Sequence, residues 1–282
     1  MNRRDFFVGG AALLAGPALA QTPHQHGPTL QPMAATPVEA ADPVLAPTGT
    51  LRAAYIVANL AQARLDRSTG AITGVVADIA RELGRRAGVP VTITPLATAS
   101  DVLQSVSTDA ADIGFVAPNP ERTGAVLYSQ TYMLVQQSAL VRADSPLQSV
   151  RDLDRTGNVI GVNTDDSVGV WLQQRLTVAT VRTTPDYSLR EAAQWLQEGA
   201  VVAFAGGRQR LSAGTRAISG LRMLADNFYG VPQSVAVPLE RADRLALVNA
   251  TLDELRANGF LADSVARSNV DGLSVVPAET LR

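Results

Sequence analysis

The sequence contains no cysteine. Disulfides, thiolate nucleophiles, cysteine-rich metal sites and a lipid anchor on an N-terminal cysteine are therefore excluded. Lysine is absent as well, so all 24 basic residues are arginine. Schiff-base chemistry at a lysine is excluded for this reason, and each basic side chain keeps its positive charge at any physiological pH.

Histidine is nearly absent, since only His24 and His26 occur, in a stretch rich in proline, alanine and threonine. A His-x-His pair in such a stretch is more often inert than metal-binding, so we predict no metal and no cofactor. The sequence also lacks a Gly-x-Ser-x-Gly elbow, a Walker loop, a dinucleotide-binding glycine fingerprint and a His-Glu-x-x-His helix. These absences argue against the common hydrolase, nucleotide-dependent and metalloenzyme classes.

A strong net charge is missing too, because the formal net charge is −2 at pH 7. A weakly acidic surface of mixed charges offers no footprint for nucleic acid or for an anionic membrane. The length of 282 residues and the hydrophobic share of 46% suffice for a sizeable core or for two lobes.

The first 20 residues have the layout of an export signal. Arg3-Arg4-Asp5-Phe6-Phe7 precedes an apolar stretch that is too short to span a bilayer and that ends in Ala18-Leu19-Ala20. We predict cleavage before Gln21. The arginine pair resembles a twin-arginine signal, which exports folded proteins, and an ordinary positively charged signal is the alternative. The expected location is the periplasm, without a lipid anchor.

The segment over residues 21–48 is rich in proline, alanine, threonine and glutamine and has no hydrophobic period, which predicts a flexible tether. From residue 51 onward, short apolar runs alternate with helical periodicity, the pattern of an α/β protein with mainly parallel strands. Val76, Ile79 and Leu83 mark the clearest amphipathic helix. We predict strands at 51–57, 91–95, 113–116, 139–142, 159–162, 201–205 and 235–238, and further helices at 101–106, 168–176, 189–197 and 242–258.

Several motifs follow one another in a fixed order. They are Leu51-Arg-Ala-Ala-Tyr55, Thr73-Gly-Val-Val-Ala-Asp-Ile-Ala-Arg-Glu-Leu83, Ala111-Asp-Ile-Gly-Phe115 ahead of Asn119-Pro-Glu-Arg122, Tyr128-Ser-Gln-Thr-Tyr132 and Ile160-Gly-Val-Asn163. Each motif is weak alone, but the ordered series resembles the family 3 extracellular solute-binding proteins, a group that includes polar amino-acid binding proteins of ABC importers. The resemblance extends from about residue 51 to residue 265.

The resemblance implies a type II periplasmic binding fold, with two α/β lobes joined by two crossover strands and the ligand between them. Residues 50–135 and 232–282 would form a discontinuous first lobe, and residues 136–231 would form the second lobe. The hinge would lie near Val135 and Val231. Open α/β sheets bind ligands beyond the carboxyl ends of their strands, which agrees with a site between such lobes.

Arg122 is the sharpest ligand-binding candidate from the resemblance. In the family, an arginine three residues after a Thr or Ser binds the ligand's carboxylate, and the rigid donor fork of arginine suits a planar carboxylate. Asn119 stands at the Thr or Ser position here. A surface arginine at the start of a helix is the alternative interpretation.

Ser167 and Asp166 are the candidates that follow the predicted strand at 159–162. The helix expected to begin near Val168 would offer backbone N–H groups to an anion, and Ser167 would add a hydroxyl. Asp166 would be either a plain helix N-cap or a partner for a cationic or hydroxyl group of the ligand.

Phe204 and Arg208 come from the predicted strand at 201–205 and its end. Amino-acid binders of the family carry an aspartate there for the ligand's ammonium, and the best alignment puts Phe204 at that position. This alignment argues against an ordinary α-amino acid as ligand. Arg208 would be either a second arginine facing a dicarboxylate, keto acid or phospho-compound, or a solvated arginine at a helix start.

In the first lobe the family places an aromatic residue after the first strand, where this chain has Ala58-Asn-Leu-Ala-Gln62. Asn59 and Gln62 would supply hydrogen bonds to the ligand in its place.

The resemblance therefore predicts a monomeric binding protein without catalytic residues. The protein would capture a small organic anion, either a carboxylate or an amino-acid-like compound. It would deliver this ligand to the membrane permease of an ABC importer. A periplasmic sensor or accessory module is the alternative from a different class. A prephenate-type dehydratase on the same fold is a third interpretation, with Asp165 and Asp166 as its available carboxylates.

Overall fold

The computed structural model describes residues 42–118, 124–164, 166–185 and 189–276. The predicted signal sequence, nearly all of the predicted tether, Asn119, Arg122 and Asp165 lie outside the described residues.

The first lobe is built on a parallel sheet whose central strand is β1 (Leu51–Ile56). β1 pairs with β4 (Val91–Leu96) on one side and with β5 (Ile113–Val116) on the other. The helices α1 (Val75–Arg86) and α2 (Ala99–Ser107) contact this sheet. The remaining elements of this lobe are β2 (Arg64–Leu65), β3 (Ile72–Thr73), β6 (Val126–Tyr128), α6 (Ala242–Ala257) and α7 (Phe260–Ser268).

The second lobe has a sheet in which β8 (Val159–Asn163) runs parallel to β9 (Thr180–Thr184) and to β10 (Ala203–Gly207). Its other elements are the 3-10 helix η2 (Val150–Leu153), α3 (Ser167–Arg175), α4 (Leu189–Gln197), α5 (Arg208–Ala217) and β11 (Leu221–Met223). Separate groups of buried apolar side chains form the cores, with Leu51, Ile79 and Phe115 in the first lobe and Val162, Leu172 and Leu224 in the second.

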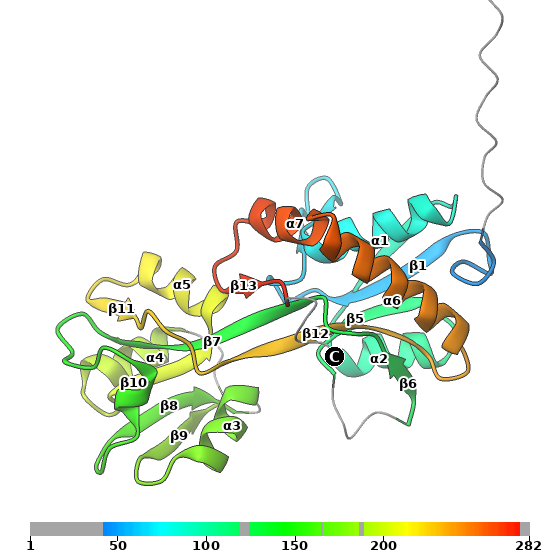
Figure 1. Ribbon diagram of the computed structural model, residues 1–282. Coiled ribbons are helices and arrows are strands. Elements are labelled where there is room, and N and C mark those ends of the chain that lie inside the picture. Colours follow the sequence, from blue (N-terminus) through cyan, green and yellow to red (C-terminus); the bar gives the residue numbers. More distant parts are fainter. Residues whose placement is uncertain (1–41, 119–123, 165, 186–188, 277–282) are drawn as a thin grey trace, which may run out of the picture. The chain divides into compact units, whose positions relative to one another are not determined.

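Two long antiparallel strands, β7 (Met133–Arg142) and β12 (Tyr229–Pro238), connect the lobes (Figure 1). Residues 229–233 of β12 pair with β7, whereas the following residues pair with β5 and β6. Val231 lies opposite Val135 in this register, and β13 (Leu273–Ser274) adds a short strand beside β7. The predicted fold of two α/β lobes joined by two crossover strands is confirmed.

Some elements differ from the sequence prediction. The strand predicted at 201–205 is β10, which continues to Gly207. The helices α5 and α7 were not predicted; α5 buries only Leu211 and Gly214, so its sequence carries little apolar period. No helix among the described residues is long and apolar enough to cross a membrane.

The predicted tether is too long at its C-terminal end. Leu45 and Ala46 are buried against the first lobe. The main-chain oxygen of Val44 accepts hydrogen bonds from Arg241 Nη2 (3.0 Å) and Arg244 Nε (2.8 Å). These contacts hold residues 44–46 against the first lobe, so the predicted tether does not extend to residue 48.

Candidate functional site

The carboxyl ends of β8 and β10 lie side by side in the second lobe, because the two strands are parallel neighbours. The helices α3 and α5 begin directly beyond these ends, at Ser167 and Arg208. The first N–H groups of a helix have no partner within the helix and carry partial positive charge. α5 has no side-chain cap, because its N-cap is Gly207. This edge of the sheet therefore presents backbone donors suited to an anionic group.

Arg210 extends across this edge. Its Nη2 donates a hydrogen bond to Asn163 Oδ1, and a Cβ placed on Gly206 would lie 3.2 Å from the same Nη2. The glycine therefore leaves the space that the guanidinium occupies. This contact fixes a permanently charged, planar donor at the ends of β8 and β10.

Asp166 is the N-cap of α3, and its Oδ1 accepts from the Val168 N–H at 3.3 Å. Burial raises the pKa of Asp166, while the charge of Arg210 and the hydrogen bond from Val168 oppose this rise. A carboxyl group with a raised pKa beside an arginine is a typical feature of binding and catalytic sites.

Tyr229, at the start of β12, adds an aromatic wall. Its hydroxyl donates to Ser167 Oγ at 3.2 Å, and its ring stacks on Trp171 with a centroid distance of 5.2 Å and an interplanar angle of 15°. The guanidinium of Arg175 lies 4.6 Å from the centroid of the Trp171 ring. We call Asn163, Asp166, Ser167, Arg210 and Tyr229 the second-lobe site.

In the first lobe, Asn59 organises the turn that follows β1. Its Oδ1 accepts from the Ala61 N–H at 3.2 Å, and its main-chain oxygen accepts from the Gln62 N–H at 2.9 Å. The neighbouring Leu60 is 57% exposed. The turn therefore presents Leu60 and the partly exposed Asn59 to solvent.

Gln62 was predicted to contact the ligand, but the structure places its side chain in the interior. The residue is fully buried. Its Nε2 donates to the main-chain oxygen of Phe115 at 3.2 Å and to Gln233 Oε1 at 2.9 Å. Because both N–H groups are used by the protein, Gln62 supports the loop from inside instead of facing solvent.

Phe204 likewise differs from its predicted position. It is fully buried within β10, and a Cβ on Gly161 would lie 2.6 Å from its ring. Its ring centroid lies 6.3 Å from that of Trp195. Since β10 continues to Gly207, the strand ends beyond Phe204, and this buried ring does not exclude an ammonium group from the ligand.

Arg208, predicted as a possible second ligand arginine, is engaged elsewhere. Its Nη1 donates to the main-chain oxygens of Leu224 (3.1 Å) and Ala225 (3.2 Å) and to Asn227 Oδ1 (3.1 Å). Its Nε lies 3.5 Å from a carboxylate oxygen of Asp271. The side chain thus anchors the start of α5 to two neighbouring segments.

Arg210, Tyr229 and Asn163 were not among the predicted site residues, and the structure adds them to the candidate site. Arg208 and Arg210 are two residues apart. Which of the two side chains reaches the end of β8 depends on where β10 ends and α5 begins. The sequence alone could have identified Asn163 as a candidate, because it is a polar residue at the end of an otherwise apolar strand.

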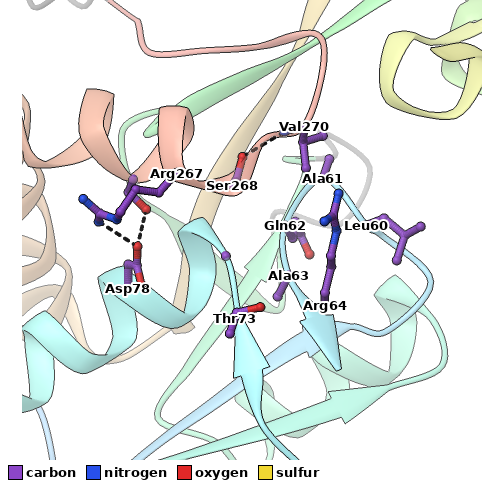
Figure 2. Close-up of a pocket in the computed structure, with 12 residues that line it drawn as sticks. Leu60, Ala61, Gln62, Ala63, Arg64, Thr73, Asp78, Arg267, Ser268 and Val270 are labelled. Carbon is purple, nitrogen blue, oxygen red and sulfur yellow. Dashed lines mark hydrogen bonds and ion pairs between the residues drawn. The ribbon is translucent and has the colours of Figure 1, made fainter. Parts of the chain in front are cut away.

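A surface pocket of about 250 Å³ in the first lobe is lined in part by Leu60 and the residues that follow it, and no residue of the second-lobe site lines it. Figure 2 shows Asp78 and Arg267 turned toward each other in its wall. Asp78 accepts from Ser264 Oγ at 2.6 Å and from Arg267 Nη2 at 3.0 Å. The charges of this pair compensate each other, so we assign the pocket no ligand. Within the described ranges, no three His, Cys, Asp or Glu residues gather as a metal site would require.

Comparisons with known proteins fit this geometry. The profile of the bacterial extracellular solute-binding proteins, family 3, matches residues 58–267. No curated protein matches the sequence significantly.

Among solved structures, the chain is similar to a binding component of an ABC transporter from Wolinella succinogenes complexed with lysine. The two sequences are 22% identical, the TM-score is 0.62, and the match covers 82% of this chain and 98% of that chain. An amino acid ABC transporter substrate-binding protein from Streptococcus pneumoniae bound to L-arginine has 18% identity, a TM-score of 0.59, and coverage of 79% and 96%. An ancestral amino-acid-binding protein, described as a precursor of cyclohexadienyl dehydratase, has 23% identity, a TM-score of 0.58, and coverage of 78% and 94%. At these identities the likeness shows the fold, and most of these neighbours are binding proteins rather than enzymes.

Proposed function

Because the chain belongs to the bacterial extracellular solute-binding proteins of family 3, we propose that it is the substrate-binding component of an ABC importer and holds a small carboxylate-bearing solute between its two lobes. Its fold is that of the type II periplasmic binding proteins. The proposal includes export to the periplasm by the twin-arginine route, a monomeric state, a membrane permease as partner, and no lipid anchor, since the chain has no cysteine.

One observation carries the proposal. Arg210 meets Asn163 at the carboxyl ends of β8 and β10, where the helices α3 and α5 begin. An arginine fork beside backbone N–H groups suits a carboxylate. Asn119 and Arg122, which follow β5 in the sequence, are proposed to bind the solute from the first lobe, together with Asn59.

The solute class includes anions and amino-acid-like compounds. Phe204 lies within the core and no longer argues against an ammonium group. Asp166 stands at the second-lobe site and can accept a hydrogen bond from an ammonium or hydroxyl group of the solute. Ser167 would contribute a hydroxyl group, and Tyr229 an aromatic ring, to the walls of the same site.

The test is a thermal-shift screen of the mature protein against L-amino acids, 2-oxo acids and dicarboxylates. A solute at a hundred times its dissociation constant stabilises the native state by about 2.7 kcal/mol, which raises the melting temperature by several degrees. Trp171 fluorescence gives a second signal, because its ring stacks on Tyr229 of the second-lobe site. If no compound shifts the melting temperature or the fluorescence, the proposal of solute capture fails and an accessory role gains support.

Arg122→Ala and Arg210→Ala are each expected to weaken binding of the solute found in that screen by about 2–5 kcal/mol, because each leaves a bound carboxylate without its arginine. Isothermal titration calorimetry measures the change. Arg67→Ala is the matched control, since Arg67 is exposed on a first-lobe loop. An unchanged affinity in either test variant removes that arginine from the proposed site.

A second candidate function is a dehydratase acting on a prephenate-like acid. It is favoured by the raised pKa of Asp166, since a general acid must hold its proton near neutral pH. Incubation with prephenate and detection of phenylpyruvate test this candidate. Formation of phenylpyruvate by the wild-type protein and its loss in Asp166→Asn would support an enzyme.

A further inference from the structure

Two buried glutamines, Gln62 and Gln233, contact each other beneath the loop that follows β1. Gln62 is fully buried and Gln233 is 2% exposed. A buried amide is costly unless it is hydrogen-bonded. Gln62 Nε2 donates to Gln233 Oε1 at 2.9 Å, and Gln233 Nε2 donates to the main-chain oxygen of Pro232 at 3.0 Å. The two amides are therefore joined by a specific buried contact, while Gln62 Oε1 has no hydrogen-bond partner among the described residues.

Gln233 occupies a particular point of the crossover strand. It is the last residue of β12 that pairs with β7, where it lies opposite Met133. The next residue, Ser234, pairs with Val116 of β5 in the first lobe. The partner of Gln62 is thus the residue at which β12 changes from one neighbouring strand to another.

The backbone around Gln62 is held as well. Its main-chain oxygen accepts from the Val76 N–H at 3.2 Å, at the start of α1. Gly74 has a φ of 114°, and a Cβ there would lie 2.9 Å from the same oxygen. The second acceptor of the Gln62 amide is Phe115, near the end of β5. Gln62 thereby joins the turn after β1, the end of β5 and the crossover strand.

We propose that Gln62 and Gln233 form an amide clasp that positions the first-lobe turn over residues 57–63 relative to the crossover strand β12. Gln62 and Gln233 are positioning residues and do not touch the solute. Through the clasp, a movement of β12 changes the placement of Asn59 and Leu60. The consequence for solute capture rests on the proposed function, whereas the clasp itself does not.

The test is hydrogen exchange measured by mass spectrometry on the full mature protein without added solute. The Gln62 and Ala63 N–H groups bond to the Asn59 main-chain oxygen, so they report on the turn. Gln62→Met and Gln233→Met remove the amide at nearly constant volume and avoid a cavity. Each variant removes the bond between the two amides and one further bond, to Phe115 in Gln62→Met and to Pro232 in Gln233→Met, and is expected to speed exchange in the 57–63 peptide at least about tenfold. The double variant is expected to speed exchange by less than the product of the two single effects, because the shared bond is lost only once.

Gln137→Met is the matched control. Gln137 is a buried glutamine of the other crossover strand, and its Nε2 donates to the Val135 main-chain oxygen at 3.2 Å. A general loss of stability would speed exchange in the 57–63 peptide in this variant too, whereas loss of the clasp would not.

Unchanged exchange of the 57–63 peptide in Gln233→Met would overturn the clasp, and so would an equal increase in Gln137→Met. Because the exchange experiment contains no solute, its result does not depend on whether the protein binds amino acids or organic acids.

Discussion

Phe204→Asp is expected to destabilise the second lobe by at least about 4 kcal/mol, and not to create an ammonium-binding site. The ring is fully buried and packs on Gly161 and Trp195. The substitution removes a large apolar side chain from this core and places a carboxylate there without a partner. Because whole domains are stable by only about 5–15 kcal/mol, this loss would be a large part of the free energy of unfolding.

Urea unfolding followed by circular dichroism and by Trp195 fluorescence measures this effect, since Trp195 lies beside the substituted ring. Phe204→Leu is the control, and it should cost less because it keeps an apolar side chain at the position. A Phe204→Asp protein with wild-type stability and a new affinity for α-amino acids would show that the ring faces the solute, contrary to its burial in the structure.

Several strands and helices could be predicted from the sequence because their signals were local, whereas β6, β9, α5, β11 and α7 were not predicted. Val76, Ile79 and Leu83 define the buried face of α1, and all three are fully buried. Apolar runs of strand length gave β1, β4, β5 and β8 within a residue or two. The two-lobe arrangement followed from the resemblance rather than from these signals, because strand order depends on contacts between distant segments.

The end of β10 could not be predicted by the same means. The run Val201-Val-Ala-Phe-Ala205 is apolar throughout, and the two following glycines suggested a turn. In the structure both glycines are extended and belong to the strand. A Cβ on Gly206 would lie 3.2 Å from Arg210 Nη2, and a Cβ on Gly207 would lie 2.7 Å from Gln209 Oε1. Because β10 ends two residues later than predicted, Arg210 rather than Arg208 contacts Asn163 at the end of β8.

The burial of the Gln62 side chain also could not be predicted from the neighbouring sequence. Asn59 and Gln62 are both polar residues of one loop, and nothing in the sequence between them distinguishes an exposed side chain from a buried one. The difference comes from Gln233, which lies 171 residues further along the chain and accepts the Gln62 hydrogen bond. Polar residues with partners distant in sequence are the positions where pattern analysis fails.

Asp112→Ala is expected to lower the free energy of unfolding by about 3–5 kcal/mol, the usual effect of removing one partner from a buried ion pair. Asp112 is fully buried and accepts from the Arg52 main-chain N–H (2.8 Å), Nε (3.1 Å) and Nη2 (2.8 Å). The fully buried Arg244 lies 3.7 Å from it. Burial lowers the pKa of Arg244, but a guanidinium stays charged near neutral pH, so the variant leaves a buried cation without its counterion.

Chemical denaturation at neutral pH measures the loss, with Asp243→Ala as the control. Asp243 is half exposed and pairs with Arg241 at 3.0 Å, so its removal should cost less than about 1 kcal/mol. The double variant Asp112→Ala/Arg244→Met should recover part of the stability lost in Asp112→Ala, because it removes the uncompensated cation together with the carboxylate. Arg244 also holds Val44 through its Nε, so the double variant should additionally speed hydrogen exchange near Leu45 and Ala46. Equal effects of Asp112→Ala and Asp243→Ala would contradict the assignment of Asp112 as the buried counterion of this lobe.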